Sequence, residues 1–195
     1  MVLEHVTAPA APSLPFLTVF QKPQPGRQYV IGADPAEGNP TSDESAATVL
    51  DEDTGEQVAV LAGRIEPDVF ADYICKLANW YNWAAALVER NNHGTAVLIW
   101  LRDNAIGMFV LRGHDRHPGW LSHSRGKALL YDGAATRLRE RRCLSCDPIT
   151  YYQLCNIEGG TQRAPAGEAD DRADALALAL AAIDQTPRGR CEVCV

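Results

Sequence analysis

Tyr29-Val30-Ile31-Gly32-Ala33-Asp34 is the stretch around which the rest of the chain is organised. Its aromatic and β-branched residues favour a strand, and a nearly continuous apolar run is typical of a central strand covered on both faces. A carboxylate at the end of such a strand must find a partner, shift its pKa or hold a cation, because the interior does not solvate it. Residues 35–40 contain two prolines and a glycine, which predicts a loop beyond the strand. Asp34 is therefore the first candidate functional residue.

The remaining sequence predicts an α/β fold. Apolar runs predict strands at 45–50, 56–61, 84–89 and 108–111, with a brief one at 143–147. Apolar residues at helical spacing predict helices at 67–81, from about 94, from 122 or 124 to about 142, at 148–154 and at 170–183. The first three strands form an antiparallel meander, and strands and helices then alternate. We therefore predict a mixed sheet, antiparallel and parallel, flanked by helices.

The composition is that of an ordinary globular protein, with 195 residues, 46% hydrophobic, 22% charged and a formal net charge of −7. This length suits one domain, which we place at 28–184, between a proline-rich extended arm or linker at 1–27 and a tail at 185–195. No apolar run reaches the ~20 residues needed to cross a bilayer. The N-terminus lacks the pattern of a secretion signal, so we expect a cytoplasmic protein with no membrane partner.

Positive charge is concentrated in one segment, residues 112–142. Its basic residues are Arg112, Arg116, Arg125, Lys127, Arg137, Arg139, Arg141 and Arg142, against Asp115, Asp132 and Glu140. A local basic surface can bind nucleic acid even when the net charge is negative. A solvated helix face explains the same pattern without a partner.

Acidic residues occur at three places that the predicted fold can bring together. Asp34 and Glu89 each end a predicted interior strand, and Asp170, Asp171 and Asp174 occupy the first turn of the last helix. If the two strands are parallel neighbours, their terminal acids lie side by side, and the helix can add its own. Such carboxylates repel one another unless cations are bound, and oxygen ligands without Cys or His favour Mg²⁺ or Mn²⁺. Taken singly, acids that begin a helix or flank a strand are common and need no function.

Three segments resemble, in order and spacing, the nuclease domain of the phage terminase large subunit. They read YVIGADPAEG at 29–38, VERNNHG at 88–94 and DDRADALA at 170–177. The resemblance covers about residues 28–184 and implies a ribonuclease H-like fold. It also implies metal-dependent cleavage of double-stranded DNA, with little sequence specificity, during viral genome packaging in the host cytoplasm.

The same resemblance implies the site residues and partners. Asp34, Glu89 and Asp171 would be the catalytic metal-binding triad, assisted by Asp170 or Asp174, with two Mg²⁺ or Mn²⁺ ions. Two such ions ~3.5–4 Å apart can activate a water and stabilise the leaving oxygen in phosphodiester hydrolysis. The implied partners are double-stranded DNA and, in a packaging complex, an ATPase domain, a portal and a small terminase subunit.

The sequence departs from the family pattern in two ways. The family often has a histidine just before its aspartate pair, where this chain has Ala169. The chain also lacks the glycine-rich phosphate loop of a packaging ATPase, so we expect either an excised nuclease domain or a stand-alone relative.

The basic segment gains a possible role from the resemblance. The candidates for DNA binding are Arg112, Arg116, Arg125, Lys127 and Arg137, which would hold phosphates through charge rather than read bases. Lys127 is the candidate for a phosphate near the cut, with a plain surface residue as the alternative.

Two Cys-x-x-Cys pairs, Cys143 with Cys146 and Cys191 with Cys194, allow a tetrahedral zinc site. The predicted strand at 143–147 would point the first two thiols to opposite faces, which favours free thiols.

Other functions remain open at this point. A Holliday-junction resolvase has acids in a similar pattern but acts on branched DNA. A non-catalytic DNA-binding module of the same fold is a second alternative, and the intact acids argue against it. A sugar-kinase-like ATPase also begins with a strand ending in Asp, but this chain is short for that class and has no phosphate-binding glycine loops.

Overall fold

A five-stranded mixed sheet forms the centre of the structure, a computed structural model that describes residues 10–186. Its strands are β1 (Leu17–Val19), β2 (Tyr29–Asp34), β3 (Ser45–Asp51), β4 (Gln57–Gly63) and β5 (Ala85–Val88). They lie in the order β1-β4-β3-β2-β5, and β2 and β5 are parallel while the other neighbours are antiparallel. The predicted mixed sheet is therefore confirmed.

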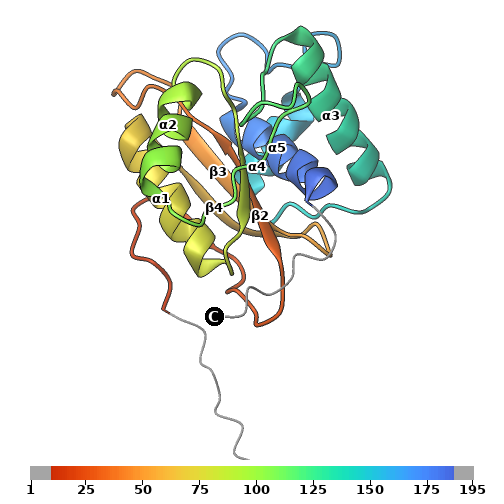
Figure 1. The fold of residues 1–195 in the computed structure, drawn as a ribbon. Helices are drawn as coiled ribbons and strands as arrows, with labels where there is room; N and C mark the ends of the chain where they lie inside the picture. The colour runs from red at the N-terminus through yellow and green to blue at the C-terminus, as the bar shows by residue number, and fades with distance from the viewer. Residues whose placement is uncertain (1–9, 187–195) are drawn as a thin grey trace, which may run out of the picture.

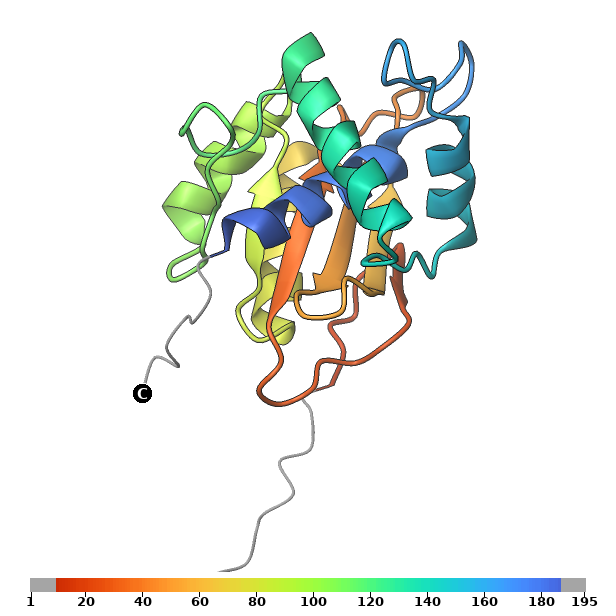
Figure 2. The same ribbon diagram turned by 90° about the vertical axis from the view of Figure 1, so that its right-hand side faces the viewer.

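Helices cover both faces of this sheet (Figure 1). In the described part of the chain they are α1 (Pro67–Trp80), α2 (Gly94–Asn104), α3 (Ser124–Arg139), α4 (Pro148–Asn156) and α5 (Asp171–Gln185). Helices α1 and α2 lie on one face, and α5 crosses the other with α3 and α4 packed beside it (Figure 2). Each face has its own apolar cluster, so the sheet is the middle of three layers.

Strand β2 is buried along its whole length, as its continuous apolar run predicts. Gly32 leaves room for α5 on this strand: a Cβ there would lie 2.1 Å from the Ala179 nitrogen and 2.2 Å from the Ala175 carbonyl oxygen. The alanines of α5 add little bulk on the helix side. The close packing brings the first turn of α5 to the end of β2 that carries Asp34.

The structure differs from the predicted elements in three places. Residues 108–111 do not form a strand, and only Val110 makes an isolated bridge, because Trp120 also pairs along the free edge of β5. Residues 143–147 form a loop with one bridge, at Leu144. Residues 17–19, predicted as part of an extended arm, instead pair with β4 as an edge strand.

The predicted tail beyond residue 186 and the first nine residues of the predicted arm lie outside the described residues. The limits of the domain at 28 and 184 therefore stay predictions. Among residues 10–186, no helix has the length and apolar character required to cross a membrane.

Candidate functional site

Asp34 and Glu89 follow the last paired residues of two neighbouring parallel strands. Ala33 pairs with Val88 in the β2–β5 register, and the Glu89 nitrogen donates a 2.8 Å hydrogen bond to the Ala33 carbonyl oxygen. Parallel strands end at the same edge of a sheet, so this register places both carboxyls at one edge. The predicted juxtaposition of the two acids is confirmed.

The first turn of α5 supplies the third acid, Asp171. The helix begins against α4, where the Gln153 side-chain oxygen accepts hydrogen bonds from the nitrogens of Arg172 (2.8 Å) and Ala173 (3.2 Å). The side chain of Asp170, the N-cap residue, makes no capping hydrogen bond, and Gln153 accepts from the first N–H groups of the helix in its place. Asp171 itself is 7% exposed and accepts a hydrogen bond from the Glu44 backbone. The start of α5 is thereby fixed against both α4 and the loop after β2.

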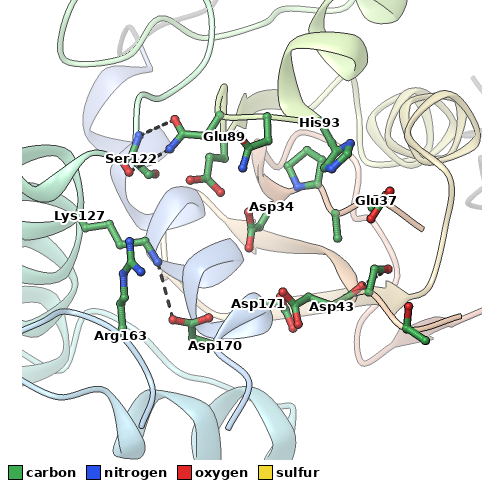
Figure 3. Close-up of a pocket in the computed structure, with 16 residues that line it drawn as sticks. Asp34, Glu37, Asp43, Glu89, His93, Ser122, Lys127, Arg163, Asp170 and Asp171 are labelled. Atoms are coloured by element: carbon green, nitrogen blue, oxygen red, sulfur yellow. Dashed lines mark hydrogen bonds and ion pairs between the residues drawn. The ribbon is translucent and has the colours of Figure 1, made fainter. Parts of the chain in front are cut away.

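These acids line a cavity of about 480 Å³ at the carboxyl end of the parallel strand pair (Figure 3). Its acidic lining residues are Asp34, Glu37, Asp43, Glu89, Asp170 and Asp171, and Lys127 and Arg163 border it on one side. Asp34, Glu89 and Asp171 come from three separate elements and face the same space. The structure therefore brings together the predicted triad, although the residues are up to 137 positions apart in sequence.

Burial and the nearby carboxylates raise the pKa values of two of these acids, Asp34 and Asp171. The pKa of Asp34 lies well above its ordinary value. Burial is the largest cause, followed by a hydrogen bond with the Glu89 carboxyl, the charge of Glu89 and the charges of Asp174 and Asp171. Burial and the charges of Asp43 and Asp170 raise the pKa of Asp171 to about 7. A hydrogen bond between two carboxyl groups requires a shared proton. The site thus favours either protons or another cation.

Asp174 and Asp170 are occupied by protein partners. Asp174 accepts hydrogen bonds from Lys127 Nζ (2.6 Å) and the Tyr131 hydroxyl (2.7 Å), and it does not line the cavity. Burial raises the pKa of Asp174 to about 6 against the opposing effect of Lys127, so the pair is ionised at neutral pH. Burial lowers the pKa of Lys127, but the charges of Asp174 and Asp170 outweigh it and raise that pKa above its ordinary value.

Asp170 lies 3.7 Å from Lys127 Nζ and accepts a 3.3 Å hydrogen bond from the Ala164 nitrogen. It therefore links α3, the loop before α5 and α5 itself. The supporting role predicted for Asp170 and Asp174 as metal ligands stays a prediction. Their contacts show a structural role for both.

The donor set fits a hard divalent cation. Within residues 10–186, no three His, Cys, Asp or Glu side chains lie close enough together to form a ready-made metal site. Asp34 and Glu89 instead share a hydrogen bond, and Asp171 lies across the same cavity. Three carboxylates around one cavity suit Mg²⁺ or Mn²⁺, because either ion would supply the positive charge that the raised pKa values of Asp34 and Asp171 show to be favoured there.

The predicted DNA-binding residues are dispersed in the structure. Arg125 is exposed in the first turn of α3, two positions before the cavity residue Lys127, and does not itself line the cavity. Arg112 and Arg116 border a second cavity, which lies beside the end of α5 and does not include the acids. Arg137 is 8% exposed and forms an ion pair with Asp184, so its guanidinium is not presented to a ligand. We therefore withdraw Arg137 from the candidate DNA-binding residues.

Cys143 and Cys146 lie on a loop that hydrogen bonds to Gln57 hold in place. The Gln57 side-chain oxygen accepts 2.9 Å hydrogen bonds from the nitrogens of both Cys146 and Asp147. The loop is not a strand, so the argument that strand alternation separates the thiols of Cys143 and Cys146 is wrong. Cys191 and Cys194 lie outside the described residues, so the alternative of a zinc site, which the sequence allowed but did not favour, remains untested.

Three cavity or supporting residues escaped the sequence analysis. Tyr131 lies four positions after Lys127 and shares its helix face, a spacing that could have identified it. Asp43 and Arg163 lie in loops without a periodic pattern, and only the fold shows that they border the site.

These features define a ribonuclease H-like α/β fold with an acidic cavity at the end of its parallel strand pair. The chain is similar to the large terminase nuclease of thermophilic phage G20c with bound magnesium, with a TM-score of 0.70 and 21% identity over 85% of this chain and 87% of that chain. The same nuclease with bound cobalt gives a TM-score of 0.71, at 21% identity and the same coverage. The Thermus phage P74-26 large terminase nuclease domain gives 0.65, with 21% identity over 84% of each chain.

No protein-family model and no curated protein matches the sequence. The resemblance to terminase nuclease domains is confirmed as a shared fold. At this level of identity the likeness shows the fold alone, and the chemistry depends on the residues of this chain.

Proposed function

We propose that this protein is a divalent-metal-dependent endonuclease that hydrolyses phosphodiester bonds of double-stranded DNA in phage genome packaging. One observation carries the proposal: Asp34, Glu89 and Asp171 line a single cavity, in which burial and neighbouring carboxylates raise the pKa values of Asp34 and Asp171. The shared fold with terminase nuclease domains supports the choice of DNA as substrate. An ATPase domain, a portal and a small terminase subunit stay predicted partners.

The three acids would hold the metal from two sides of the cavity. Asp34 and Glu89 would bind from the sheet edge, and Asp171 would bind from α5 on the other side of the cavity. When bound, Mg²⁺ or Mn²⁺, as a pair of ions, supplies an activated water and stabilises the leaving oxygen. The chain's own contribution is rigidity, because Gln153 fixes the start of α5 and Lys127 joins α3 to Asp174.

Plasmid digestion tests this function. With Mg²⁺ or Mn²⁺ the parent should nick and linearise supercoiled DNA, whereas EDTA and the Asp34→Asn variant should abolish cutting. Asn keeps the size of the side chain and removes its charge, so folding should be retained. Asp103→Asn, which changes an exposed acid on α2, is the matched control and should cut like the parent.

The outcome also separates the alternatives. Cutting by Asp34→Asn at the parent rate would refute the proposed metal site. Cleavage of four-way junctions in preference to linear duplex would indicate a resolvase instead. Binding of DNA without cutting, in either metal, would indicate a non-catalytic module.

A further inference from the structure

The acidic cavity needs positive charge beside it to accept a DNA strand. Its lining includes six Asp or Glu residues, and each phosphate of the substrate carries a further negative charge. Within residues 10–186, the Lys and Arg residues that line it are Lys127 and Arg163. How these two cations are already engaged decides which of them can bind a phosphate.

The ammonium group of Lys127 is already paired with carboxylates of the protein. Its ammonium donates a 2.6 Å hydrogen bond to Asp174 and lies 3.7 Å from Asp170, and its side chain is 13% exposed. A phosphate that bound Lys127 would have to compete with two carboxylates already in place. Lys127 therefore balances the charge of α5 more than it attracts substrate.

Arg163 is different, because none of the described residues balances its charge. In the described chain, no carboxylate lies at ion-pairing distance from its guanidinium, and the residue is exposed. Figure 3 shows its side chain extending to the flank of the cavity beside Lys127 and Asp170. A cation without a protein partner at the rim of an acidic cavity is placed to receive an anion.

The loop that carries Arg163 is anchored at this residue and at the next one. The Glu158 nitrogen donates a 2.9 Å hydrogen bond to the Arg163 carbonyl oxygen. The next residue, Ala164, donates to the Asp170 carboxylate at 3.3 Å, which connects the loop to α5. The backbone of Arg163 is thus held in register with the helix that supplies Asp171.

We propose that Arg163 binds a phosphate of the DNA strand and positions the scissile bond over Asp34, Glu89 and Asp171. The planar guanidinium can donate two parallel hydrogen bonds to phosphate oxygens, which fixes orientation as well as charge. This inference rests on the proposed nuclease function. It assigns substrate positioning to a residue that lies outside the basic segment 112–142.

The test compares Arg163→Ala, Arg163→Lys and Arg102→Ala with the parent. Arg102 is exposed on α2 and pairs with its neighbour Asp103, so it is a matched control outside the cavity. We would measure initial rates of duplex cleavage in Mg²⁺ at several DNA and NaCl concentrations. Binding of a fluorescent duplex with Ca²⁺ in place of Mg²⁺, followed by anisotropy, is the second measurement.

Arg163→Ala should lower kcat/KM about 10-fold to 100-fold, since one charged hydrogen-bonded contact is lost. It should also reduce the salt dependence of binding by about one phosphate contact, a slope change of about 0.9. Arg163→Lys should recover the salt dependence but only part of the rate, and Arg102→Ala should match the parent.

Cleavage and binding by Arg163→Ala equal to those of Arg102→Ala would overturn the assignment and leave the nuclease function intact. A parent that does not cleave would instead overturn the proposed function. In that case the binding comparison still decides whether Arg163 contacts a phosphate.

Discussion

Lys127 donates a 2.6 Å hydrogen bond to Asp174 in the protein interior, where the Asp174 residue is 5% exposed. Lys76 and Asp72 are joined at the same distance on the surface of α1, where their side chains are 52% and 37% exposed. The two ion pairs have the same N–O distance and differ in burial, and the interior pair also contacts Tyr131 and Asp170. They therefore form a matched pair for measuring what burial adds.

Lys127→Ala should lower the free energy of unfolding by about 3 kcal/mol at pH 8, because it leaves a buried carboxylate without its cation. The loss should be smaller at pH 5. Asp174 has a pKa of about 6 even with Lys127 present, so without the lysine it takes up a proton at pH 5 and is no longer a buried charge. Urea unfolding at both pH values measures the two losses.

Lys76→Ala is the control and should leave the free energy of unfolding nearly unchanged at either pH, since water replaces the exposed partner. Equal losses for Lys127→Ala and Lys76→Ala would show that the interior pair contributes no more than a surface one.

Asp171→Asn should stabilise the metal-free protein at high pH. The pKa of Asp171 is raised from 3.8 to about 7, so the folded state holds a proton that the unfolded state releases above pH 4. The unfolding free energy of the parent therefore falls as pH rises from about 4 to 7, and the loss is complete above 7. In EDTA at pH 8 the variant should be about 2–4 kcal/mol more stable than the parent, and near pH 4 the two should be similar.

Metal should reverse this order. Mg²⁺ binds the deprotonated carboxylates of the folded state, so it should raise the melting temperature of the parent at pH 8 more than at pH 6. The Asp171→Asn variant should show a much smaller rise at either pH. A variant less stable than the parent in EDTA at pH 8 would contradict the charge repulsion assigned to Asp171.

Arg125→Ala and Arg137→Ala should have opposite effects. Arg125 is exposed at the start of α3, the helix that carries the cavity residue Lys127, so its loss should weaken duplex binding and lower the salt slope by about 0.9, with unchanged stability. Arg137 is buried, so its loss should cost about 1–2 kcal/mol through packing and leave DNA binding unchanged. Asp184, its partner, has a side chain 63% exposed and would be hydrated, which keeps the cost moderate. Anisotropy at several NaCl concentrations and urea unfolding separate the two effects.

The sequence was sufficient for the four strands β2 to β5 and for the strand-end acids Asp34 and Glu89. A buried run that ends on Asp34 and another that ends on Glu89 carry local signals, and parallel pairing then puts the two carboxyls together. The order of the elements followed from apolar periodicity in the same way. Edge features were harder to predict, because β1 has few residues and pairs only once β4 is in place.

Local sequence patterns could not predict which side chains pair with one another. Arg125 and Arg137 both belong to one basic helix, and only the packing of α5 shows that one is exposed and the other paired with Asp184. Asp170 and Asp174 likewise resemble Asp171 in sequence, yet they make contacts with Lys127 and Ala164 that the sequence does not reveal. The sequence shows directly which residues are charged. Which of these charges pair with one another depends on residues distant in the chain.

Gln153→Ala should destabilise the start of α5. The Gln153 oxygen is the acceptor for two backbone N–H groups there, and the residue is 5% exposed, so water would not easily replace it. We expect a loss of about 2 kcal/mol in unfolding free energy. Cleavage should also be slower, because Asp171 is the first residue of the same helix turn. Gln153→Glu keeps an acceptor at this position and should retain most of the stability. Urea unfolding and plasmid cleavage provide the two readouts.

Gly32→Ala should be the most disruptive of small substitutions in the sheet. The added Cβ would lie 2.1 Å from a backbone atom of Ala179, and neither β2 nor α5 can move without disturbing the core on both sides. We expect a loss of about 3 kcal/mol or more in unfolding free energy. Because α5 carries Asp171, the metal-dependent rise in melting temperature should also shrink.

Gly133→Ala is the matched control in α3, where an added Cβ meets no atom within 4 Å. There the same change should stabilise the protein by about 0.5–1 kcal/mol, because alanine favours the helix more than glycine does. The sign of the two effects thus depends on space alone, since the chemical change is identical. A Gly32→Ala variant as stable as the parent would show that α5 does not rest on β2 at this distance, and the placement of Asp171 beside Asp34 would lose its structural basis.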